Sequence, residues 1–426
     1  MIGTGYVGLV SGTCFADIGN QVICVDKDSN KIEKLNSGIS PIYEPGLDEL
    51  IKKNYISKRL TFTTDIQMAI KLSDIIFICV GTPTKKGSLN VDLSFVYKCT
   101  KEILKYTKKK KILVTKSTVP IGTGDEIEKI LKKKKRLFTV ISNPEFLREG
   151  EAIRDFRFPD RIVIGSNENK VFSVMKKLYL PLMNKGAKFF MTSRRGAELI
   201  KYASNAFLAT KITFINEIAN LCEKSNIDVK DVAIGMGLDE RIGSRFLRAG
   251  PAYGGSCFPK DTKAITVTGD IFKTNLSIIK SVIKSNEKRK IFLTNRVKKI
   301  LSNKIKNKRI AFLGVTFKPN TDDMRESSTL FMVPFLVKYG AKITYYDPSG
   351  EKEEFSKYKS VLFCNNIREA CQNTDLVIIH TDWEEFKAID FKKMFKNKKI
   401  KIFDMRNLYS PSSMKKQGIL YYSIGR

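Results

Sequence analysis

Cys257 stands in a loop whose residue types could make it a nucleophile. The loop reads Ala249-Gly-Pro-Ala-Tyr-Gly-Gly-Ser-Cys-Phe-Pro-Lys-Asp261, so that an ammonium group, Lys260, and a carboxylate, Asp261, follow the cysteine within four residues. A thiol near a cation ionises more readily, and the thiolate is the nucleophilic form. The pair Gly254-Gly255 lets the backbone bend and lets a ligand approach closely. The alternative is a buried structural cysteine, but a polar, glycine-rich loop is a poor place for one.

A glycine motif at the start of the chain could bind a dinucleotide. Residues Gly3-Thr-Gly-Tyr-Val-Gly8 fit G-x-G-x-x-G, whose glycines permit a tight turn, close approach to a pyrophosphate and close helix–strand packing. Asp26 ends the apolar run Val22–Val25 and lies 26 − 8 = 18 residues past the last glycine. A carboxylate there accepts hydrogen bonds from a ribose diol and repels a 2′-phosphate, which favours NAD over NADP. The alternative is a structural turn with a surface aspartate.

The two signals together indicate one type of oxidation. NAD takes a hydride, and a cysteine thiolate can add to an aldehyde to give a thiohemiacetal. Loss of a hydride from the thiohemiacetal gives a thioester, which water converts to an acid. A catalytic cysteine with NAD therefore indicates oxidation to a carboxylate.

The elements that must position these residues follow from the hydrophobic pattern. The first and last thirds of the chain alternate short apolar runs with amphipathic stretches, which is the βαβ pattern of a parallel sheet. Between them, Ala197–Lys224 keeps apolar residues at helical spacing and predicts one long helix, and Leu276–Leu301 predicts another. We expect an α/β fold with two Rossmann-like, doubly wound parallel-sheet domains joined by a long central helix and a helical connector. The predicted strands are Val22–Asp26, Ile75–Val80, Lys111–Thr115, Thr139–Ser142, Ile310–Gly314, Lys342–Tyr346, Leu376–His380 and Lys401–Phe403.

The expected domains are residues 1–195, which would bind NAD, a central helical domain at 196–301, and a second Rossmann-like domain at 302–426. One feature conflicts with this layout. The glycine motif starts at residue 3, so the strand that should precede it, central in a doubly wound sheet, is almost absent. This suggests a start codon assigned too late, or a trimmed sequence.

Composition excludes several classes of protein. The 426 residues suffice for two or three domains of ~100–200 residues each. With 42% hydrophobic and 28% charged residues, the chain has an ordinary globular composition, so disorder is excluded. The apolar runs are too short to span a bilayer, and no basic-then-apolar leader opens the chain, so we expect no membrane partner. No pair of the eight cysteines is spaced C-x-x-C, which makes a zinc ribbon or thioredoxin chemistry unlikely. Several, such as Cys24 and Cys79, lie in strand-like apolar runs as small hydrophobic residues, which favours a reducing, cytoplasmic location.

The charge and the single histidine narrow the possibilities further. The net charge of +32 suggests an anionic partner, either nucleic acid or the phosphorylated substrate of a lysine-rich enzyme. The lysines are scattered in short runs such as Lys108–Lys111, without a nucleic-acid-binding motif, so we expect no nucleic acid as primary partner. His380 is the single histidine, which excludes multi-histidine zinc sites, and we expect no metal.

Further motifs make a resemblance specific. The sequence resembles the UDP-glucose/GDP-mannose dehydrogenase family, collinearly from residue 2 to about residue 410. The motifs that carry the resemblance are Gly3–Leu9, Tyr43-Glu-Pro-Gly-Leu47, Val80-Gly-Thr-Pro83, Lys116-Ser-Thr-Val-Pro120, Asn143-Pro-Glu-Phe-Leu-Arg-Glu-Gly150, Lys201-Tyr-Ala-Ser-Asn-Ala206, Tyr253–Asp261, Phe317-Lys318 with Arg325-Glu-Ser, and Phe403-Asp-Met-Arg-Asn407.

The resemblance implies oxidation of the C6 alcohol of a nucleotide sugar to a carboxylate, with two NAD+ used per turnover. It implies that Cys257 is the nucleophile, and that Lys201 and Asn205, four apart on one helix face, donate to the oxygen at C6. Asp261 would position a water or share the base role with Lys201. Burial should lower the pKa of such a lysine, whereas a lysine that reaches solvent at the helix edge is the alternative. The remaining implied catalytic residues are Thr118, which would hold the water, and Glu145, matched to thioester hydrolysis.

The resemblance also implies binding residues and a dimer. Arg241 matches a residue that the family inserts from a neighbouring subunit, so a homodimer or higher homo-oligomer is expected. The second Rossmann-like domain would bind the UDP-sugar. The implied cofactor-binding residues are Gly3, Gly5, Tyr6, Val7, Gly8, Asp26, Lys31, Thr82, Thr118, Glu149, Lys260 and Arg325. The implied substrate-binding residues are Glu145, Phe146, Leu147, Arg148, Glu149, Lys201, Asn205, Arg241, Phe246, Leu247, Arg248, Ala249, Gly250, Tyr253, Gly254, Lys318 and Arg406.

The loop sequences favour one substrate among the relatives' substrates. Ser256-Cys-Phe-Pro-Lys-Asp261 and Arg245-Phe-Leu-Arg-Ala-Gly250 favour UDP-glucose, with GDP-mannose next and UDP-N-acetyl-mannosamine as a further alternative. A simple two-electron dehydrogenase shares the Rossmann domain but needs neither Cys257 nor a second α/β domain, and would release one NADH per substrate. A basic nucleic-acid-binding protein is the non-enzymatic alternative.

Overall fold

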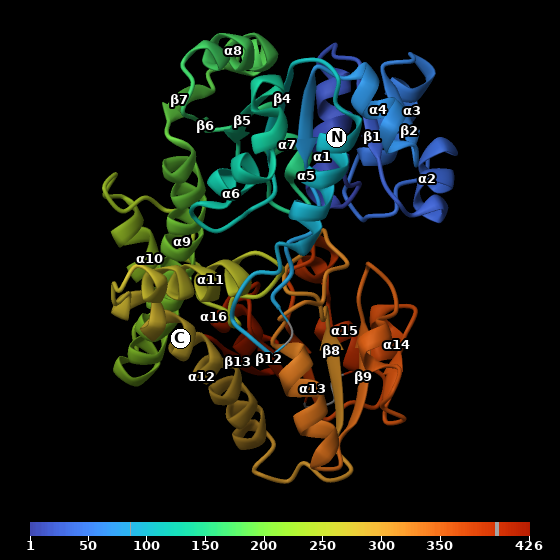
Figure 1. The fold of residues 1–426 in the computed structure, drawn as a ribbon. Helices are drawn as coiled ribbons and strands as arrows, with labels where there is room; N and C mark the ends of the chain where they lie inside the picture. The colour runs from blue at the N-terminus through green and yellow to red at the C-terminus, as the bar shows by residue number, and fades with distance from the viewer. Residues whose placement is uncertain (86, 397–399) are drawn as a thin grey trace. The chain divides into compact units, whose positions relative to one another are not determined.

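The structure is a computed structural model that describes residues 1–85, 87–396 and 400–426. The chain divides into two compact units, which are drawn with their elements labelled in Figure 1. Unit 1 comprises Met1–Ser204 and Val267–Thr274, and unit 2 comprises Asn205–Thr266 and Asn275–Arg426. Two of the three boundaries fall inside helices, α9 (Arg194–Ser225) and α11 (Phe258–Ile271), and the third lies after α11. The three-domain division expected from the sequence stays a prediction.

Unit 1 is built on short strands with helices between them. Its strands run in two hydrogen-bonded groups, β1-β2 and β3-β4-β5-β6-β7, and all pairs are parallel except β5 with β6. The strands are β1 (Val22–Val25), β2 (Leu60–Thr63), β3 (Ile75–Ile78), β4 (Lys111–Thr115), β5 (Phe138–Ser142), β6 (Arg161–Ser166) and β7 (Lys188–Thr192). The helices are α1 (Tyr6–Asp17), α2 (Ser29–Asn36), α3 (Leu47–Ile56), α4 (Ile66–Leu72), α5 (Ser94–Tyr106), α6 (Thr123–Ile130), the 3-10 helix η1 (Lys132–Leu137), α7 (Ala152–Arg157) and α8 (Lys170–Met183).

The central strand of unit 1, predicted from the sequence to be almost absent, is formed by the first residues of the chain. Ile2 forms parallel bridges to Val25 on one side and to Ile78 on the other, so it joins the two groups of strands. Its N–H donates to Phe77 O at 2.8 Å, and its carbonyl accepts from Cys79 N at 2.8 Å. A short central strand is therefore paired on both sides, and it leads directly into the glycine motif.

Unit 2 contains a six-stranded sheet in the order β10-β9-β8-β11-β12-β13, with every pair parallel. The order reverses between β8 and β11, as in a doubly wound sheet. The strands are β8 (Arg309–Leu313), β9 (Lys342–Tyr346), β10 (Val361–Phe363), β11 (Leu376–Ile379), β12 (Lys401–Asp404) and β13 (Leu420–Ser423). The helices, with α9 and α11, are α10 (Val229–Gly237), α12 (Ser277–Ile300), α13 (Thr329–Lys338), η2 (Glu353–Phe355), α14 (Ile367–Ala370), η3 (Glu384–Ala388), α15 (Phe391–Phe395) and α16 (Pro411–Lys416).

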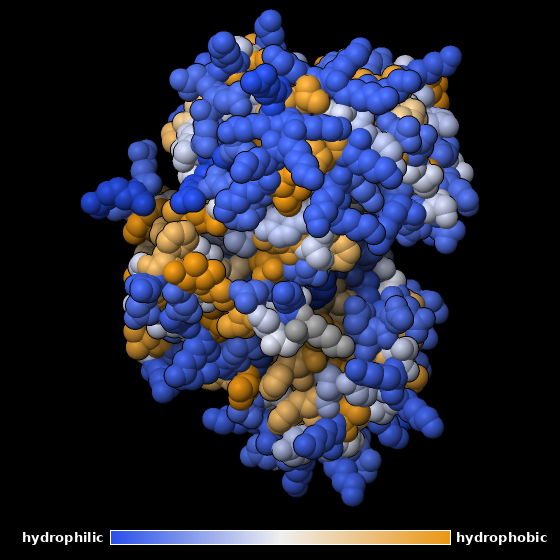
Figure 2. All heavy atoms as spheres, in the orientation of Figure 1, coloured by the Kyte–Doolittle hydropathy of each residue, from blue (hydrophilic) through white to orange (hydrophobic). Residues whose placement is uncertain are grey.

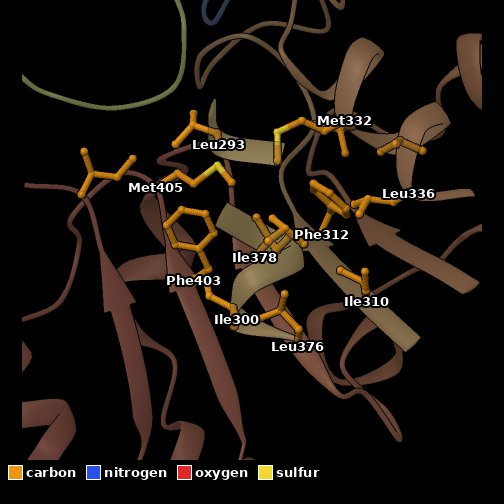
Figure 3. Close-up of a cluster of buried hydrophobic side chains, with 14 of the residues drawn as sticks. Leu293, Ile300, Ile310, Phe312, Met332, Leu336, Leu376, Ile378, Phe403 and Met405 are labelled. Carbon is orange, nitrogen blue, oxygen red and sulfur yellow. The ribbon is translucent and has the colours of Figure 1, made fainter. Parts of the chain in front are cut away.

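Side chains from α12, α13 and the central strands form the larger core of unit 2. Phe312, Ile378 and Phe403 alternate with residues that face the other side of the sheet, and all three are fully buried (Figure 3). Leu293 of α12 and Met332 of α13 pack on the same face of the sheet. Burying one such side chain contributes roughly 1.5–3 kcal/mol, so the apolar alternation of the strands determines which face the helices cover.

The fold expected from the sequence is confirmed, with one difference of strand direction. Each of the eight predicted strands is present to within one or two residues, and the predicted long helices correspond to α9 and α12. In unit 1, β6 runs antiparallel to β5, with which it pairs only at Ile141↔Ser166 and Ser142↔Gly165. Within the described ranges no helix is long and apolar enough to cross a membrane, and no group of three or more His, Cys, Asp or Glu side chains could hold a metal ion.

Candidate active site

The glycine motif of unit 1 forms a cradle that fits a pyrophosphate. Gly5 is the N-cap of α1 and makes no side-chain cap bond, and a Cβ built on it would meet no atom within 4 Å. A Cβ on Gly8 would instead lie 1.9 Å from Gly3 O, so this glycine is required for helix–strand contact. The space beside Gly5 at the N-terminus of α1 is therefore open, and a helix N-terminus is a favourable place for an anion.

Asp26 follows β1 and is kept charged. Its Oδ2 accepts hydrogen bonds from Thr4 N at 2.8 Å and Thr4 Oγ1 at 2.7 Å, and its Oδ1 accepts from Asp28 N at 3.1 Å. Partial burial would raise the pKa of Asp26, but these bonds and the nearby charge of Lys31 outweigh burial and lower the pKa. The carboxylate retains acceptor capacity for a ribose diol and repels a 2′-phosphate.

Two threonines lie just beyond adjacent parallel strands of unit 1. Thr82 follows β3, Thr118 follows β4, and Thr82 Oγ1 donates to Thr118 O at 3.0 Å. Carboxyl ends of parallel strands are the usual place for ligands in open α/β sheets. The cofactor role of both threonines stays a prediction.

Lys201 and Glu145 form a buried ion pair in unit 1. Lys201 is 3% exposed and Glu145 5% exposed, and Lys201 Nζ lies 3.1 Å from Glu145 Oε1. The second oxygen of Glu145 accepts from Leu147 N, and Lys201 Nζ lies 5.2 Å from the centroid of the Phe146 ring. The alternative in which Lys201 reaches solvent at the helix edge is therefore wrong. Its ammonium group is instead placed beside a carboxylate that could take its proton.

A second buried lysine, Lys116, was not among the predicted site residues. Lys116 follows β4, is 5% exposed, and donates to Asn143 Oδ1 at 3.4 Å, which also accepts from Tyr179 Oη at 2.5 Å. Burial lowers the pKa of Lys116 to about 8, opposed by the Cys79 and Glu145 charges and reinforced by Lys201. A lysine directly after a buried strand, inside the quoted Lys116–Pro120 motif, was the available sequence signal.

The segment 145–149 is braced on both sides within unit 1. The guanidinium of Arg161 lies 3.9 Å from the centroid of the Phe146 ring and donates to Ser204 Oγ at 3.3 Å. Arg148, predicted to bind substrate, places its guanidinium on Asp155, with contacts of 2.9 and 2.6 Å. The side chain of Arg148 therefore stabilises the turn into α7.

In unit 2, Cys257 differs from every other cysteine of the chain. All eight lie within the described residues and none forms a disulfide; Cys257 is partly exposed, whereas the other seven are buried. It directly precedes α11, whose N-terminus favours a thiolate at this position. Its Sγ lies 3.5 Å from Ser256 Oγ. The alternative of a buried structural cysteine is excluded at this position.

Asn205, Asp261 and Lys260 form a connected group near Cys257 in unit 2. Asn205 Nδ2 donates to Asp261 Oδ2 at 2.6 Å, and Lys260 Nζ donates to Asp261 Oδ1 at 2.6 Å. Asp261 is 1% exposed, and its N–H donates to Cys257 O at 2.8 Å in the first turn of α11. A buried carboxylate with one ammonium and one amide partner is fixed in orientation and can accept a further proton or water.

The structure gives a further reason for the paired glycines. A Cβ on Gly254 would lie 2.6 Å from Glu326 O, and one on Gly255, where φ is +81°, would lie 2.7 Å from the Phe317 ring. Gly255 N donates to Arg325 O at 2.8 Å. The two glycines therefore let the cysteine loop pack closely against the backbone and ring of segment 317–326. This packing holds the loop in place.

The predicted substrate residues of unit 2 fall into two groups. The first group is segment 246–250 with Arg406. A Cβ built on Gly250 would lie 3.5 Å from Arg406 Nη1, so the segment and this arginine are neighbours. Arg406 is half-buried and donates to His380 O at 2.7 Å and Phe317 O at 2.8 Å. The second group consists of Arg241, which is exposed and binds Asp239, and Lys318, which is half-buried. Within segment 246–250, the exposed Arg248 lies 3.6 Å from Asp382. Arg325, predicted to bind the cofactor, is exposed and binds Asp323.

Phe246 is the residue of segment 246–250 with a left-handed backbone, at φ +66°. Its ring packs 6.1 Å from the ring of Phe258, the first residue of α11. Tyr253 is held by Asn286, which accepts from Tyr253 N at 2.9 Å and donates to its carbonyl at 3.1 Å. A strained residue held by packing is typical of ligand sites, and this one is the first residue of the segment predicted to contact the nucleotide and sugar.

The comparisons with known proteins cover the whole chain. The UDP-glucose/GDP-mannose dehydrogenase family matches through its NAD binding domain at residues 1–183, its central domain at 195–288 and its UDP binding domain at 311–411. The UDP-glucose 6-dehydrogenase of Rhizobium meliloti (strain 1021) is 48% identical, covering 100% of this chain and 99% of that protein, and UDP-glucose 6-dehydrogenase TuaD of Bacillus subtilis (strain 168) is 45% identical, covering 100% and 92%. A solved UDP-glucose dehydrogenase from the hyperthermophilic archaeon Pyrobaculum islandicum superposes with a TM-score of 0.90 at 33% identity, covering 99% of this chain and 96% of that one. This chain therefore belongs to the UDP-glucose/GDP-mannose dehydrogenase family.

Proposed function

We propose that the chain is an NAD-dependent UDP-glucose 6-dehydrogenase that oxidises the C6 alcohol of UDP-glucose to the carboxylate of UDP-glucuronate. The observation that carries the proposal is the placement of Cys257. It is the one cysteine of eight that is not buried, it precedes a helix, and it belongs to a chain with an NAD binding domain. The name shared by the two curated relatives supports UDP-glucose as substrate.

The first oxidation converts the alcohol to an aldehyde. The hydroxyl proton passes to a base, for which Lys201, Asp261 and Glu145 are the candidates, while Asn205 and Lys201 donate hydrogen bonds to the C6 oxygen. A buried lysine next to a carboxylate can alternate between donor and acceptor as the proton moves. NAD+ held by the glycine cradle and Asp26 would supply the hydride acceptor for this oxidation, and a second NAD+ would supply it for the later one.

The second oxidation proceeds through Cys257. The thiolate adds to the aldehyde carbon, forming a C–S bond and a thiohemiacetal whose oxygen takes a proton. Loss of that proton and of a hydride gives the thioester. Water held by Thr118 then attacks the thioester carbon, the C–S bond breaks, and the acid and the Cys257 thiol are released. Glu145 or Asp261 takes the proton of the attacking water.

Most of the proposed cofactor residues lie in unit 1, whereas Lys260 and Arg325 lie in unit 2, and the proposed substrate residues are found in both units. In unit 1, the glycine cradle would hold the pyrophosphate, Asp26 and Lys31 the ribose, and Thr82, Thr118 and Glu149 the remaining cofactor groups. In unit 2, segment 246–250, Tyr253 and Arg406 would hold the UDP-sugar, which the matched UDP binding domain supports. Arginine suits a diphosphate because its guanidinium can donate two parallel hydrogen bonds.

A count of NADH released per UDP-glucose consumed tests the proposal. Two NADH with the wild type, and loss of steady turnover in Cys257→Ser, are expected. Cys222→Ser, in the same unit, is the matched control and should retain turnover. One NADH per substrate, or an unaffected Cys257→Ser variant, would instead place the chain with simple two-electron dehydrogenases. A higher kcat/KM for GDP-mannose than for UDP-glucose would overturn the substrate assignment.

We also propose that the protein is a homodimer. On α9, Phe207, Phe214 and Leu221 recur at seven-residue intervals, and they are 64%, 45% and 63% exposed. Apolar residues gather on the surface over the region of α9 and α10 (Figure 2). A contiguous apolar patch of this kind is typical of an interface, and a second copy would supply Arg241 to its neighbour. Light scattering should give twice the chain mass, and a monomer for Phe214→Asp; a monomeric, fully active wild type would contradict the proposal.

The expected domains and location complete the proposal. The boundaries at 195/196 and 301/302 are supported by the three family domains, which match on either side of them. Limited proteolysis should therefore cut first near residues 302–309, since α9 runs uninterrupted across the other boundary. Eight cysteines without a disulfide among them favour the reducing cytoplasm as the location of the protein.

A further inference from the structure

The Tyr43–Leu47 motif has no place in the proposed mechanism, yet it contains a buried carboxylate. Glu44 is 8% exposed in a segment whose neighbours Tyr43, Pro45 and Gly46 are exposed. Gly46 has φ +81° and is the N-cap of α3, whose first residue, Leu47, is fully buried. The turn therefore fixes Glu44 so that its side chain points into unit 1, because Leu47 anchors the helix that follows.

Both oxygens of Glu44 accept hydrogen bonds. Oε2 accepts from Tyr6 Oη and from Gly150 N, the latter at 2.6 Å. Oε1 accepts from Ala152 N at 2.7 Å and from Ile153 N at 3.3 Å. Gly150 N also lies 2.7 Å from Tyr6 Oη, so one backbone N–H is shared between the two side chains. We refer to Glu44, Tyr6 and the N–H groups of Gly150, Ala152 and Ile153 as the Glu44 clamp.

The clamp connects two segments with different ligands in the proposed function. Tyr6 is the first residue of α1 and lies inside the glycine motif that would hold the dinucleotide. Gly150 directly follows segment 145–149, which would contact the substrate and which contains Glu145. The two segments are separated by more than 130 residues, and Glu44 belongs to neither.

A second contact ties the other end of α7 to α1. Arg157, the last residue of α7, donates to Asp17 Oδ2 at 2.7 Å, and Asp17 is the last residue of α1. Asp17 also binds Lys53 of α3 at 2.8 Å. The clamp holds the start of α7 and this ion pair holds its end. The position of α7 relative to α1 is therefore fixed at two points.

We propose that Glu44 is a positioning residue that fastens segment 145–150 to the dinucleotide loop, so that one carboxylate sets the geometry of both the cofactor and the substrate contacts of unit 1. The identity of the two ligands rests on the proposed function. The charge of Glu44 is essential because four donors converge on it, and an amide in its place would direct an N–H group at one of them. Without the clamp, each ligand binds only the fraction of molecules whose loop is correctly placed, so both affinities fall.

Glu44→Gln tests the proposal, with Glu49→Gln as the matched control because Glu49 is an exposed carboxylate on α3. Binding of NADH is measured by fluorescence, and binding of UDP-glucose without cofactor by calorimetry, both well below the unfolding temperature. Each Kd should rise about tenfold or more in Glu44→Gln and stay within about twofold of wild type in Glu49→Gln. A lower Tm with both Kd values unchanged would make Glu44 a structural helix cap only, and a rise in one Kd alone would also overturn the proposal.

Tyr6→Phe keeps the test decisive if Glu44→Gln does not fold. Tyr6 is proposed to contact the cofactor and not the substrate, so any effect on UDP-glucose must pass through Gly150. The Kd for UDP-glucose should rise roughly three- to tenfold in Tyr6→Phe and stay at the wild-type value in Tyr55→Phe. An unchanged Kd for UDP-glucose in Tyr6→Phe would refute the connection. If wild type forms no NADH from UDP-glucose, the proposed function fails, while the NADH affinity of Glu44→Gln still decides whether Glu44 positions the dinucleotide loop.

Discussion

Lys201 Nζ lies 3.1 Å from Glu145 Oε1, and the two side chains are 4% and 5% exposed. Removing two charges from water is costly, and their attraction offsets that cost only while both partners are present. The pair therefore has two roles that can be separated. Each side chain stabilises the buried charge of the other inside unit 1, and the lysine is placed beside a carboxylate with which it can exchange a proton.

Loss of one partner of this pair should cost more stability than loss of both. We expect Lys201→Met to lower the free energy of unfolding by roughly 3–5 kcal/mol, because Glu145 is left buried without its counter-charge. The double variant Lys201→Met with Glu145→Gln should recover most of that loss, yet remain at least about a hundredfold below wild type in kcat. Urea unfolding and steady-state NADH formation measure the two effects. Equal stability of the single and double variants would show that the two charges are not coupled.

Lys116 should give the protein a distinctive dependence of stability on pH. Burial holds its pKa at about 8 in the folded protein, below the ordinary 10.5, so the unfolded chain binds this proton more tightly. Between these two pKa values the unfolded state carries more protons, and the contribution of Lys116 to stability rises with pH; below pH 8 it is a constant penalty of roughly 3 kcal/mol. We expect Lys116→Met to be more stable than wild type at pH 7, with the difference shrinking towards pH 10.

The control for Lys116→Met is Lys110→Met, because Lys110 is exposed just before the same strand. Its stability difference from wild type should be small and independent of pH between 7 and 10. Urea unfolding at four pH values measures both variants. A Lys116→Met difference that does not change with pH would mean that the folded protein holds this lysine at its ordinary pKa.

Asp26 should determine the choice between NAD and NADP. We expect Asp26→Asn to weaken NADH binding about ten- to hundredfold, because hydrogen bonds from a diol to a charged acceptor are lost. The same change removes the repulsion of a 2′-phosphate, so the ratio of NADPH to NADH affinity should rise. Asp28→Asn, two residues away, is the comparison variant for NADH and NADPH fluorescence titrations. An unchanged affinity ratio in Asp26→Asn would remove Asp26 from the cofactor site.

Two glycines of the same motif should fail in different ways. A Cβ on Gly5 meets no atom within 4 Å, so Gly5→Ala should keep the wild-type Tm but weaken NADH binding, since the methyl group enters the cradle. A Cβ on Gly8 would lie 1.9 Å from Gly3 O, so Gly8→Ala should lower the Tm by several degrees as well. Scanning calorimetry with NADH titration separates the two results. Unimpaired NADH binding in Gly5→Ala would place the pyrophosphate elsewhere.

The amino-acid sequence alone was enough for the local features. Strands such as β4 and β11 are continuous apolar runs, and α9 keeps apolar residues at helical spacing over many turns, so local patterning determines these elements. The glycine cradle and Asp26 were also predictable, because the motif and the strand end lie within one βαβ unit. Cys257 could be singled out because its polar, glycine-rich loop is unlike the apolar runs that contain most of the other cysteines.

The pairing of distant side chains was decided only by the tertiary structure. Lys201 with Glu145, and Asn205 with Asp261, are each 56 residues apart, and Glu44 reaches Gly150 across 106 residues. Periodicity gives the face on which a residue lies but not what packs against that face, so Glu44 could not be recognised as a buried charge, and for Lys116 the strand before it was the only signal. The same limit applies to Gly254. A side chain at this position would clash with the carbonyl oxygen of Glu326, which comes from a different part of the chain.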